Sequence, residues 1–256
     1  MDLARRRGLW VVEDCALSLF AAEGTRPLGS TGHLGVFCFY KTLPVPNGGA
    51  PVVNDPAVAA DPPAPRPAPF ASTLSHAAGS VLANAALRFG DAGEALRTGV
   101  RRGYALARGA SGLQPVSTGT MTFDPEARDL GMSPLSDRIA RRCDAEEIVA
   151  ARRRNYFLLL GRLRDRVPPV LAEVPAGASP LFYPLLCDDK AAVQARLAAK
   201  GIETVDFWCE GHAACPVDEF PEVALLRRRV LELPVHQDLE PEDMAHVARS
   251  VREALG

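Results

Sequence analysis

Two short apolar runs, each ending in polar residues, constrain the fold of this chain most strongly. The first is Gly8–Asp14, and the second is Leu34–Tyr40, which Lys41 follows directly. Continuous apolar runs of this length are typical of parallel strands buried on both faces, and open α/β sheets bind ligands beyond the carboxyl ends of such strands. The sequence therefore predicts an α/β fold in which Asp14 and Lys41 lie at a common pocket.

Weaker sequence patterns predict the secondary structure of the other residues up to 131. A turn at Asn47-Gly48-Gly49 separates the second apolar run from a further apolar segment. We expect a short helix over 15–23, a returning strand over 50–54, an irregular Pro- and Ala-rich stretch over 55–71, helices within 72–108 and a loop over 111–131.

A second unit begins near Ser133. Its first element is a long helix from about Asp144 to Asp165, with Asp144 as the N-cap and Glu147 completing a capping box. After it we expect a strand over 180–187, a helix over 189–200, a strand over 202–208 and helices over 220–231 and 241–255. This order predicts a small α+β domain over 131–256, preceded by a partial large domain over 1–130 whose residues 56–130 form a loop and connecting helices.

Charge and cysteine usage exclude several classes of function. The 29 basic and 31 acidic residues give a net charge of -2, which provides no field to attract nucleic acid or an anionic membrane. The apolar stretch after Arg5–Arg7 is too short for a signal peptide or a membrane span. The six cysteines include no C-x-x-C pair, which is typical of reduced thiols. We therefore expect a cytoplasmic protein that binds neither nucleic acid nor membrane.

An acid and an amine at one pocket suggest pyridoxal 5'-phosphate (PLP) chemistry. PLP needs a lysine amine to hold it covalently and a carboxylate against its pyridine nitrogen. Two simpler interpretations remain open, because an Asp after a strand is often a helix N-cap and a lysine beside a Gly-Gly turn is usually solvated surface. Spacing alone does not choose between these interpretations for Asp14 and Lys41.

Longer motifs carry a resemblance to a known family. The segments are Val11–Ala16, Leu28–Lys41 and Gly48–Asp55, followed in order by Arg152–Tyr156, Lys200–Ile202 with Trp208, and Leu231–His236. Together they resemble the DegT/DnrJ/StrS family of PLP-dependent nucleotide-sugar aminotransferases. The resemblance implies the aspartate-aminotransferase-like fold, PLP fold type I, and it covers nearly the whole chain except residues 56–130.

The resemblance also implies roles for three residues. Lys41 would be the catalytic lysine that holds PLP, Asp14 would face the pyridine nitrogen, and Cys38 would stand where the family commonly has a phosphate-binding serine. The implied reaction transfers an amino group from an amino acid such as glutamate to a keto sugar nucleotide. Members of the family are usually homodimers, so we expect the same of this chain.

This chain also departs from the family pattern. We expect that the N-terminal part of the family's large domain is missing from it. Leu17 stands where a Gln or His often contacts the cofactor, His33 stands where Asp is usual, and the thiol of Cys38 is a weaker donor than a hydroxyl. These departures keep an alternative open: a truncated or degenerate family member that acts without catalysis as a partner or regulatory subunit.

One further segment has the residue types of a metal site. Cys209, His212 and Cys215 lie close together in sequence, but no second clustered pair accompanies them to complete a tetrahedral zinc site. We therefore predict no metal, and we interpret the segment as a loop. The arginine runs and His236 are likewise interpreted as structural features.

Overall fold

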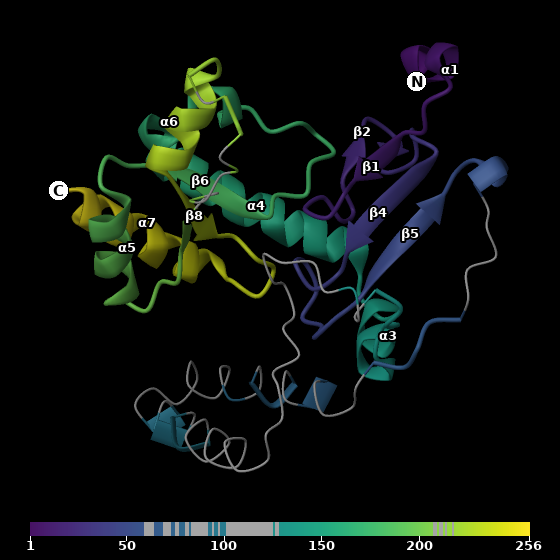
Figure 1. Cartoon of the computed structure of the whole chain (residues 1–256). Coiled ribbons are helices and arrows are strands. Elements are labelled where there is room, and N and C mark those ends of the chain that lie inside the picture. Colours follow the sequence, from purple (N-terminus) through teal and green to yellow (C-terminus); the bar gives the residue numbers. More distant parts are fainter. Residues whose placement is uncertain are drawn as a thin grey trace. The chain divides into compact units, whose positions relative to one another are not determined.

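The computed structural model shows a mixed α/β protein (Figure 1). It describes residues 1–58, 128–206 and most of 209–256 (all but 210, 211, 213 and 217), with a few short stretches between 64 and 125. Its contacts form two compact units, one made of residues 1–37 and 144–256 and the other of residues 38–143. The division expected from the sequence, into a partial large domain over 1–130 and a small domain over 131–256, refers to the domains of the family. It stays a prediction.

The N-terminal part of the first unit contains two parallel strands. β1 pairs with β4 in a register that sets Val12 opposite Leu34 and Asp14 opposite Val36, so the parallel arrangement expected from the two apolar runs is confirmed. The elements are α1 (Asp2–Arg7), β1 (Val12–Asp14), β2 (Ala22–Glu23), β3 (Arg26–Pro27) and β4 (Leu34–Cys38).

The expectation that these strands are buried on both faces is wrong for this chain. Trp10 is 62% exposed and Val12 is 56% exposed, and Val36 of β4 is exposed as well. The apolar runs indicated the strand type correctly, but Val12 and Asp14 of β1 are exposed.

The helix expected over residues 15–23 is also wrong. Asp14 Oδ1 accepts a hydrogen bond from the Ala16 amide at 3.0 Å, which is a local turn that competes with helix formation. Two further turns follow, and Phe20 adopts a left-handed backbone conformation with φ of 65°. A left-handed residue cannot continue a right-handed helix, so the chain bends into the β2–β3 hairpin instead.

The described elements of the second unit include one strand and one helix. They are β5 (Gly49–Val53), the 3-10 turn η1 (Pro56–Val58) and α3 (Pro134–Ala140). Ser133 caps α3, since its side chain accepts a hydrogen bond from the Ser136 amide. The helical pattern over 72–108 and the loop over 111–131 lie largely outside the described residues.

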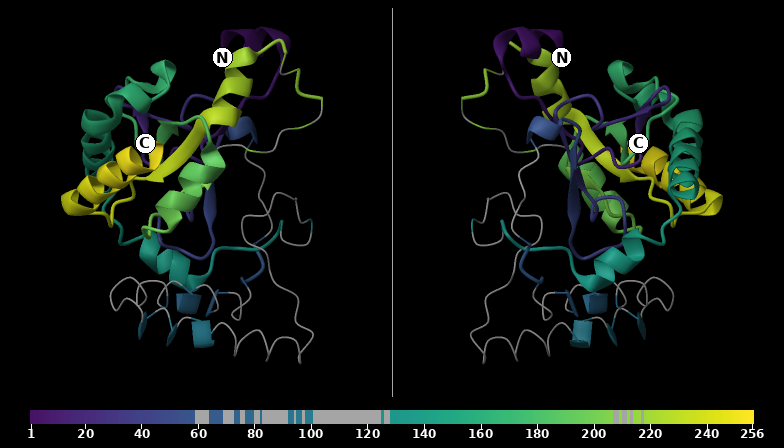
Figure 2. Two further views of the ribbon diagram at one scale, coloured as in Figure 1. Left: turned by 90° about the vertical axis from the view of Figure 1, so that its left-hand side faces the viewer. Right: turned by 90° about the vertical axis from the view of Figure 1, so that its right-hand side faces the viewer.

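The C-terminal part of the first unit is a three-stranded antiparallel sheet packed against helices. Figures 1 and 2 both show α4 and α7 side by side, and α5 also packs on α7. The strand order is β6-β8-β7. The elements are α4 (Ala145–Leu163), η3 (Arg164–Arg166), η4 (Pro169–Leu171), β6 (Phe182–Leu186), α5 (Lys190–Ala198), β7 (Val205–Asp206), α6 (Pro221–Arg229), β8 (Val230–Pro234) and α7 (Pro241–Leu255).

Most of these elements match the sequence expectations. Asp144 caps α4 through its bond from the Glu147 amide, as predicted, and Gly201 follows α5 with a φ of 76°. The strand over 202–208 is found as Val205–Asp206, while residues 207 and 208 lie outside the described part. The expected helix over 220–231 ends at Arg229, because Val230–Pro234 forms β8, the central strand of the sheet.

The main apolar core lies between this sheet and its helices. Leu185, Leu231 and Leu233 of the strands are completely buried against residues of α4, α5 and α7. Because the core is assembled from residues 156–254, the C-terminal part of the first unit has the packing needed for stability.

Candidate functional site

Asp14 lies at the carboxyl end of β1, in the first unit. Its carboxylate is exposed, and one oxygen accepts the bond from the Ala16 amide. The Cys15 amide donates to the Val36 carbonyl at 2.9 Å, which continues the pairing with β4 one residue past Asp14. The strand therefore delivers the carboxylate to the edge of the sheet, where α/β folds bind ligands.

The neighbouring Glu13 organises the loop before β4. Its carboxylate accepts hydrogen bonds from the amides of Gly29 (3.1 Å), Thr31 (2.6 Å) and Gly32. Burial would raise the pKa of Glu13, but these three bonds outweigh it and hold the pKa below its ordinary value. A side chain at Gly35 would collide with the backbone of Gly29, so this loop passes directly over β4. Glu13 is not among the site residues predicted from the sequence.

Lys41 lies on a tight turn in the second unit. The amides of Thr42 and Leu43 donate to the Phe39 carbonyl at 3.0 and 2.8 Å, and the Phe39 amide donates to the Gly48 carbonyl at 3.0 Å. Lys41 itself is exposed, whereas Thr42 and Leu43 are buried. The turn is thus anchored by its buried residues and presents the lysine amine outward.

The far side of the same turn is fixed to α3. Asn47 Oδ1 accepts hydrogen bonds from the Ser133 amide at 3.0 Å and from the Ser136 hydroxyl at 2.8 Å. Gly48 has a φ of 121°, and a Cβ there would lie 2.5 Å from Met132 Sδ, so both conformation and space favour glycine at this position. The Asn-Gly-Gly turn marked in the sequence is therefore rigidly supported.

Cys38 and Tyr40 lie on the chain directly before Lys41. Burial and a hydrogen bond with the Cys38 thiol both raise the pKa of the Tyr40 hydroxyl. Cys38 is half-buried, and Tyr40 is 40% exposed.

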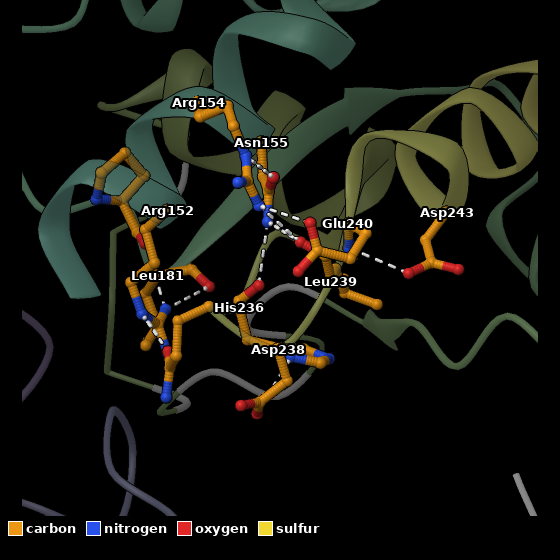
Figure 3. Close-up of polar contacts among 11 residues, drawn as sticks. Arg152, Arg154, Asn155, Leu181, His236, Asp238, Leu239, Glu240 and Asp243 are labelled. Atoms are coloured by element: carbon orange, nitrogen blue, oxygen red, sulfur yellow. Dashed lines mark hydrogen bonds and ion pairs between the residues drawn. The ribbon is translucent and has the colours of Figure 1, made fainter. Parts of the chain in front are cut away.

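The family landmarks Arg152–Tyr156 and Leu231–His236 meet in a polar cluster of the first unit (Figure 3). Arg152 is only 3% exposed and donates to Gln237 Oε1 at 2.8 Å and to the carbonyls of Pro180 and Leu181. Burial lowers the pKa of its guanidinium to about 10, although the Asp238 carboxylate opposes the shift. The hydrogen bonds of Arg152 therefore join α4 to the segment before β6 and to the loop after β8.

Asn155 and His236 complete this cluster. Asn155 is fully buried, and its amide donates to the carbonyls of His236 (2.9 Å) and Leu239 (3.0 Å). His236 Nδ1 lies 3.6 Å from Asp238 Oδ2, which is longer than a hydrogen bond. Burial lowers the pKa of His236, against the opposing effect of Asp238. The loop after β8 is thus held by α4, as expected of structural residues.

Within the described residues, no group of three or more His, Cys, Asp or Glu side chains could hold a metal ion. His212 Nδ1 instead accepts a hydrogen bond from the Ala214 amide, at 3.1 Å. In the same part of the chain, no helix is long and apolar enough to cross a membrane.

Comparison with known proteins finds a family model that matches the N-terminal region. Residues 1–62 match the model of the DegT/DnrJ/EryC1/StrS aminotransferase family. Over 61 residues the chain is 44% identical to L-glutamine:scyllo-inosose aminotransferase of Streptomyces griseus, a region that makes up 23% of this chain and 14% of that enzyme.

Solved aminotransferase structures share the fold of the whole chain. A DegT DnrJ EryC1 StrS aminotransferase from Brucella abortus superposes with a TM-score of 0.59 at 20% identity, covering 100% of this chain and 60% of its own. The aminotransferase TlmJ from Streptoalloteichus hindustanus gives 0.56 at 21% identity, with 99% and 60% covered. PseC of Helicobacter pylori, an aminotransferase involved in the biosynthesis of pseudoaminic acid, gives 0.56 at 15% identity, with 99% and 62% covered.

The solved structures define the fold of this chain as an aminotransferase fold. The chain has the fold of the DegT/DnrJ/EryC1/StrS aminotransferases and carries the sequence of that family over residues 1–62, so the resemblance seen in the sequence is confirmed. It spans about 60% of the length of the solved structures that it matches. The roles of Asp14, Cys38 and Lys41 stay predictions.

Proposed function

We propose that this chain takes part in PLP-dependent transfer of an amino group, with Lys41 as the lysine that holds the cofactor. The observation that carries the proposal is the placement of Lys41: an exposed amine on a turn fixed by buried neighbours, in the order of motifs that the family shares. A rigid turn supports the precise positioning that a covalent cofactor requires.

The donor set is suited to PLP. Among the described residues, neither Asp14 nor Lys41 forms an ion pair, so the carboxylate and the amine remain available to a ligand. When bound, PLP would supply the electron sink for a substrate carbanion. Asp14 would keep the pyridine nitrogen protonated by accepting its hydrogen bond, and Cys38 would contact the phosphate.

The proton transfers fall to Lys41. Beside a bound substrate, the amine at Nζ of Lys41 would be the group that takes up a proton from the substrate carbon and gives it back. The same residue would serve as base and acid in both half-reactions, first with an amino donor such as glutamate and then with the keto acceptor.

The proposal also covers the substrate and the oligomeric state. The acceptor would be a keto sugar nucleotide, as the resemblance implies, and the chain would act in the cytoplasm as a homodimer. In this scheme residues 1–130 represent part of the large PLP-binding domain, and the sheet β6-β8-β7 with its helices represents the small C-terminal domain.

The competing proposal is a non-catalytic family member that serves as a partner or regulatory subunit. Leu17 favours it, because an exposed leucine at this position offers no hydrogen bond to a cofactor, and the weak donor Cys38 favours it as well. In that case Lys41 would have no more affinity for PLP than a surface lysine.

The chain is well suited to a direct test, because it contains only three lysines: Lys41, Lys190 and Lys200. The protein is mixed with PLP, the visible absorbance of lysine-bound cofactor is recorded, and borohydride reduction followed by peptide mapping locates the modified lysine. We expect the label on Lys41 and loss of the absorbance in Lys41→Ala.

Lys200→Ala is the matched control. Lys200 is a partly exposed surface lysine that pairs with Glu253, and its removal should leave PLP binding unchanged. A label distributed over Lys41 and Lys200 alike, or no label at all, would favour the non-catalytic alternative.

A further inference from the structure

The first unit contains an open cavity that none of the proposed roles uses. Its volume is about 610 Å³, which is within the range of small-molecule sites. The N-terminal half of α4 forms one wall, and the segment between β1 and β2 forms the other. The lining residues are Phe20, Ala145, Glu146, Val149, Ala150 and Arg153. The residues assigned to the cofactor are not among them.

The α4 residues of the cavity lie on one side of the helix. Ala145, Val149 and Arg153 follow one another at intervals of four residues, and Glu146 and Ala150 form the neighbouring row. Arg153 comes seven residues after Glu146, which corresponds to about 10 Å along the helix axis. The wall is therefore apolar in its middle, with a carboxylate towards one end and a guanidinium towards the other.

Phe20 stands in the other wall with an unfavourable backbone conformation. Its φ of 65° is left-handed, which is uncommon for a bulky residue and persists only where the surrounding structure fixes it. The Ala22 amide donates to the Gly177 carbonyl at 2.8 Å, and a Cβ at Gly177 would collide with the Ala22 carbonyl. This close approach fixes the segment that carries Phe20, and strained residues of this kind concentrate at ligand sites.

The same loop orients Arg153. Its Nη1 donates to the carbonyls of Pro175 at 2.8 Å and Ala178 at 2.9 Å, and its Cζ lies 5.4 Å from the centroid of the Phe157 ring. The donors at Nε and Nη2 are not used by these contacts. Among the described residues, neither Arg153 nor Glu146 belongs to an ion pair. The cavity thus has two charges of opposite sign on its lining, each without an ionic partner in the described part of the chain.

Two such charges match a ligand that carries both signs. A free α-amino acid has its ammonium and carboxylate on the same carbon, and with a hydrogen bond at each end it spans roughly 8 Å, close to the separation of the two side chains along α4. Arginine binds a carboxylate through paired N–H donors, and a glutamate accepts hydrogen bonds from an ammonium. The apolar surface of Phe20 and Val149 between them favours a ligand with an apolar side chain.

We propose that this cavity is a binding site for a free α-amino acid with a large apolar side chain. Arg153 holds the carboxylate through Nε and Nη2, Glu146 accepts hydrogen bonds from the ammonium, and the side chain packs against Phe20 and Val149. The site goes beyond the proposed function, because none of its residues is assigned to the cofactor and it does not require that Lys41 holds PLP.

The test compares ligands that differ by one group. The full chain, without PLP, is titrated calorimetrically with L-phenylalanine, with 3-phenylpropionate, which lacks the ammonium, and with 2-phenylethylamine, which lacks the carboxylate. Each analogue loses charge-assisted hydrogen bonds, so L-phenylalanine should bind at least about tenfold more tightly than either. L-Alanine should bind about tenfold more weakly than L-phenylalanine, since it has no ring to bury.

Two glutamates in the first turn of α4 provide a matched pair of variants. Glu146→Gln should weaken the binding of L-phenylalanine about tenfold and leave that of 3-phenylpropionate unchanged, because only the ammonium meets Glu146. Glu147→Gln removes the same charge from the same turn, but Glu147 does not line the cavity, so both affinities should stay as in the wild type. Equal unfolding midpoints would show that these exposed substitutions leave α4 intact.

Several results would contradict the proposal. A wild type that does not bind L-phenylalanine would remove the site, and equal affinities for L-phenylalanine and 3-phenylpropionate would show that the ammonium is not recognised. Equal effects of Glu146→Gln and Glu147→Gln would place the ligand elsewhere, as would loss of L-phenylalanine binding in Lys41→Ala. Labelling of Lys41 by PLP is measured separately, so failure of either proposal leaves the other standing.

Discussion

Among individual residues, the buried polar side chains of α4 contribute to the fold by bonding to backbone carbonyls on other elements. Arg152 reaches the carbonyls of Pro180 and Leu181, just before β6, and Asn155 reaches two carbonyls of the loop after β8 (Figure 3). Buried carbonyls need such partners, because an unpaired polar group in the interior costs free energy. These two side chains therefore link segments that lie far apart in sequence.

Replacing Asn155 by Ala tests this role. Asn155 is fully buried, so the substitution removes its two hydrogen bonds to the His236 and Leu239 carbonyls, each of about 1 kcal/mol, and should lower the free energy of unfolding by about 2 kcal/mol. Urea denaturation followed by circular dichroism measures the change. Arg154→Ala is the comparison, since Arg154 also donates to the Leu239 carbonyl, and to Asn155 Oδ1, but its side chain is 41% exposed, and it should cost less than about 1 kcal/mol.

Glu13 predicts a dependence of stability on pH. Its pKa is below the ordinary value of 4.5 in the folded protein, so its contribution to stability is present above that value and is lost as the pH falls through the folded-state pKa. Glu13→Gln should therefore be less stable than the wild type at neutral pH, and the difference should shrink below pH 4.5. Urea titrations across this range give the comparison.

The control for this pH dependence is Glu23→Gln. Glu23 is an exposed residue paired with Arg26, and exposed pairs of this kind contribute little. A stability difference between Glu13→Gln and the wild type that stays constant from neutral to acidic pH would contradict the role assigned to the three amide bonds.

At the scale of elements, β8 is the strand on which the C-terminal sheet depends. It lies between β6 and β7, and Leu231 and Leu233 on it are completely buried. Its sequence, Val-Leu-Glu-Leu-Pro, continues directly from α6. The helical spacing of apolar residues therefore runs into the strand, and the sequence pattern does not show that the helix ends at Arg229. Pairing with Phe182–Leu186, nearly fifty residues earlier in the chain, decides that these residues are extended.

Leu233→Ala measures the contribution of this strand. Removing a fully buried leucine side chain leaves a cavity and should lower the free energy of unfolding by about 3 kcal/mol. Val205→Ala on β7 is the matched control, because Val205 is 58% exposed and should cost no more than about 0.5 kcal/mol. Similar losses for the two variants would show that β8 is not the centre of the core.

At the scale of the whole molecule, the main core and the proposed cofactor lysine come from different parts of the chain. The core is assembled from residues 156–254, whereas Lys41 lies on a turn near residue 40 and is exposed. Stability and cofactor binding should therefore respond to different substitutions.

A pair of variants tests this separation. Lys41→Ala should abolish covalent binding of PLP while the free energy of unfolding, measured without PLP, changes by less than about 0.5 kcal/mol. Leu233→Ala should do the reverse, with reduced stability and an unchanged dissociation constant for PLP under conditions where the protein stays folded. Coupled losses in both variants would contradict the separation.

The sequence by itself determined the features that depend on local patterns. Continuous apolar runs predicted the parallel strands β1 and β4, Asp144 predicted the start of α4, and the ordered motifs around Asp14 and Lys41 pointed to the family whose model residues 1–62 match. Capping, strand type and motif order are all encoded within a few neighbouring residues. The order of amino acids along the chain is therefore sufficient to specify them.

Only the tertiary structure decided the features that depend on distant partners. It placed Val230–Pro234 in the sheet through pairing with β6, turned residues 15–23 into bends through the Asp14 side chain and the left-handed Phe20, and joined Asn155 to the loop after β8. Each of these depends on which groups meet in three dimensions, and local propensity is too weak to specify that when pairing and burial oppose it.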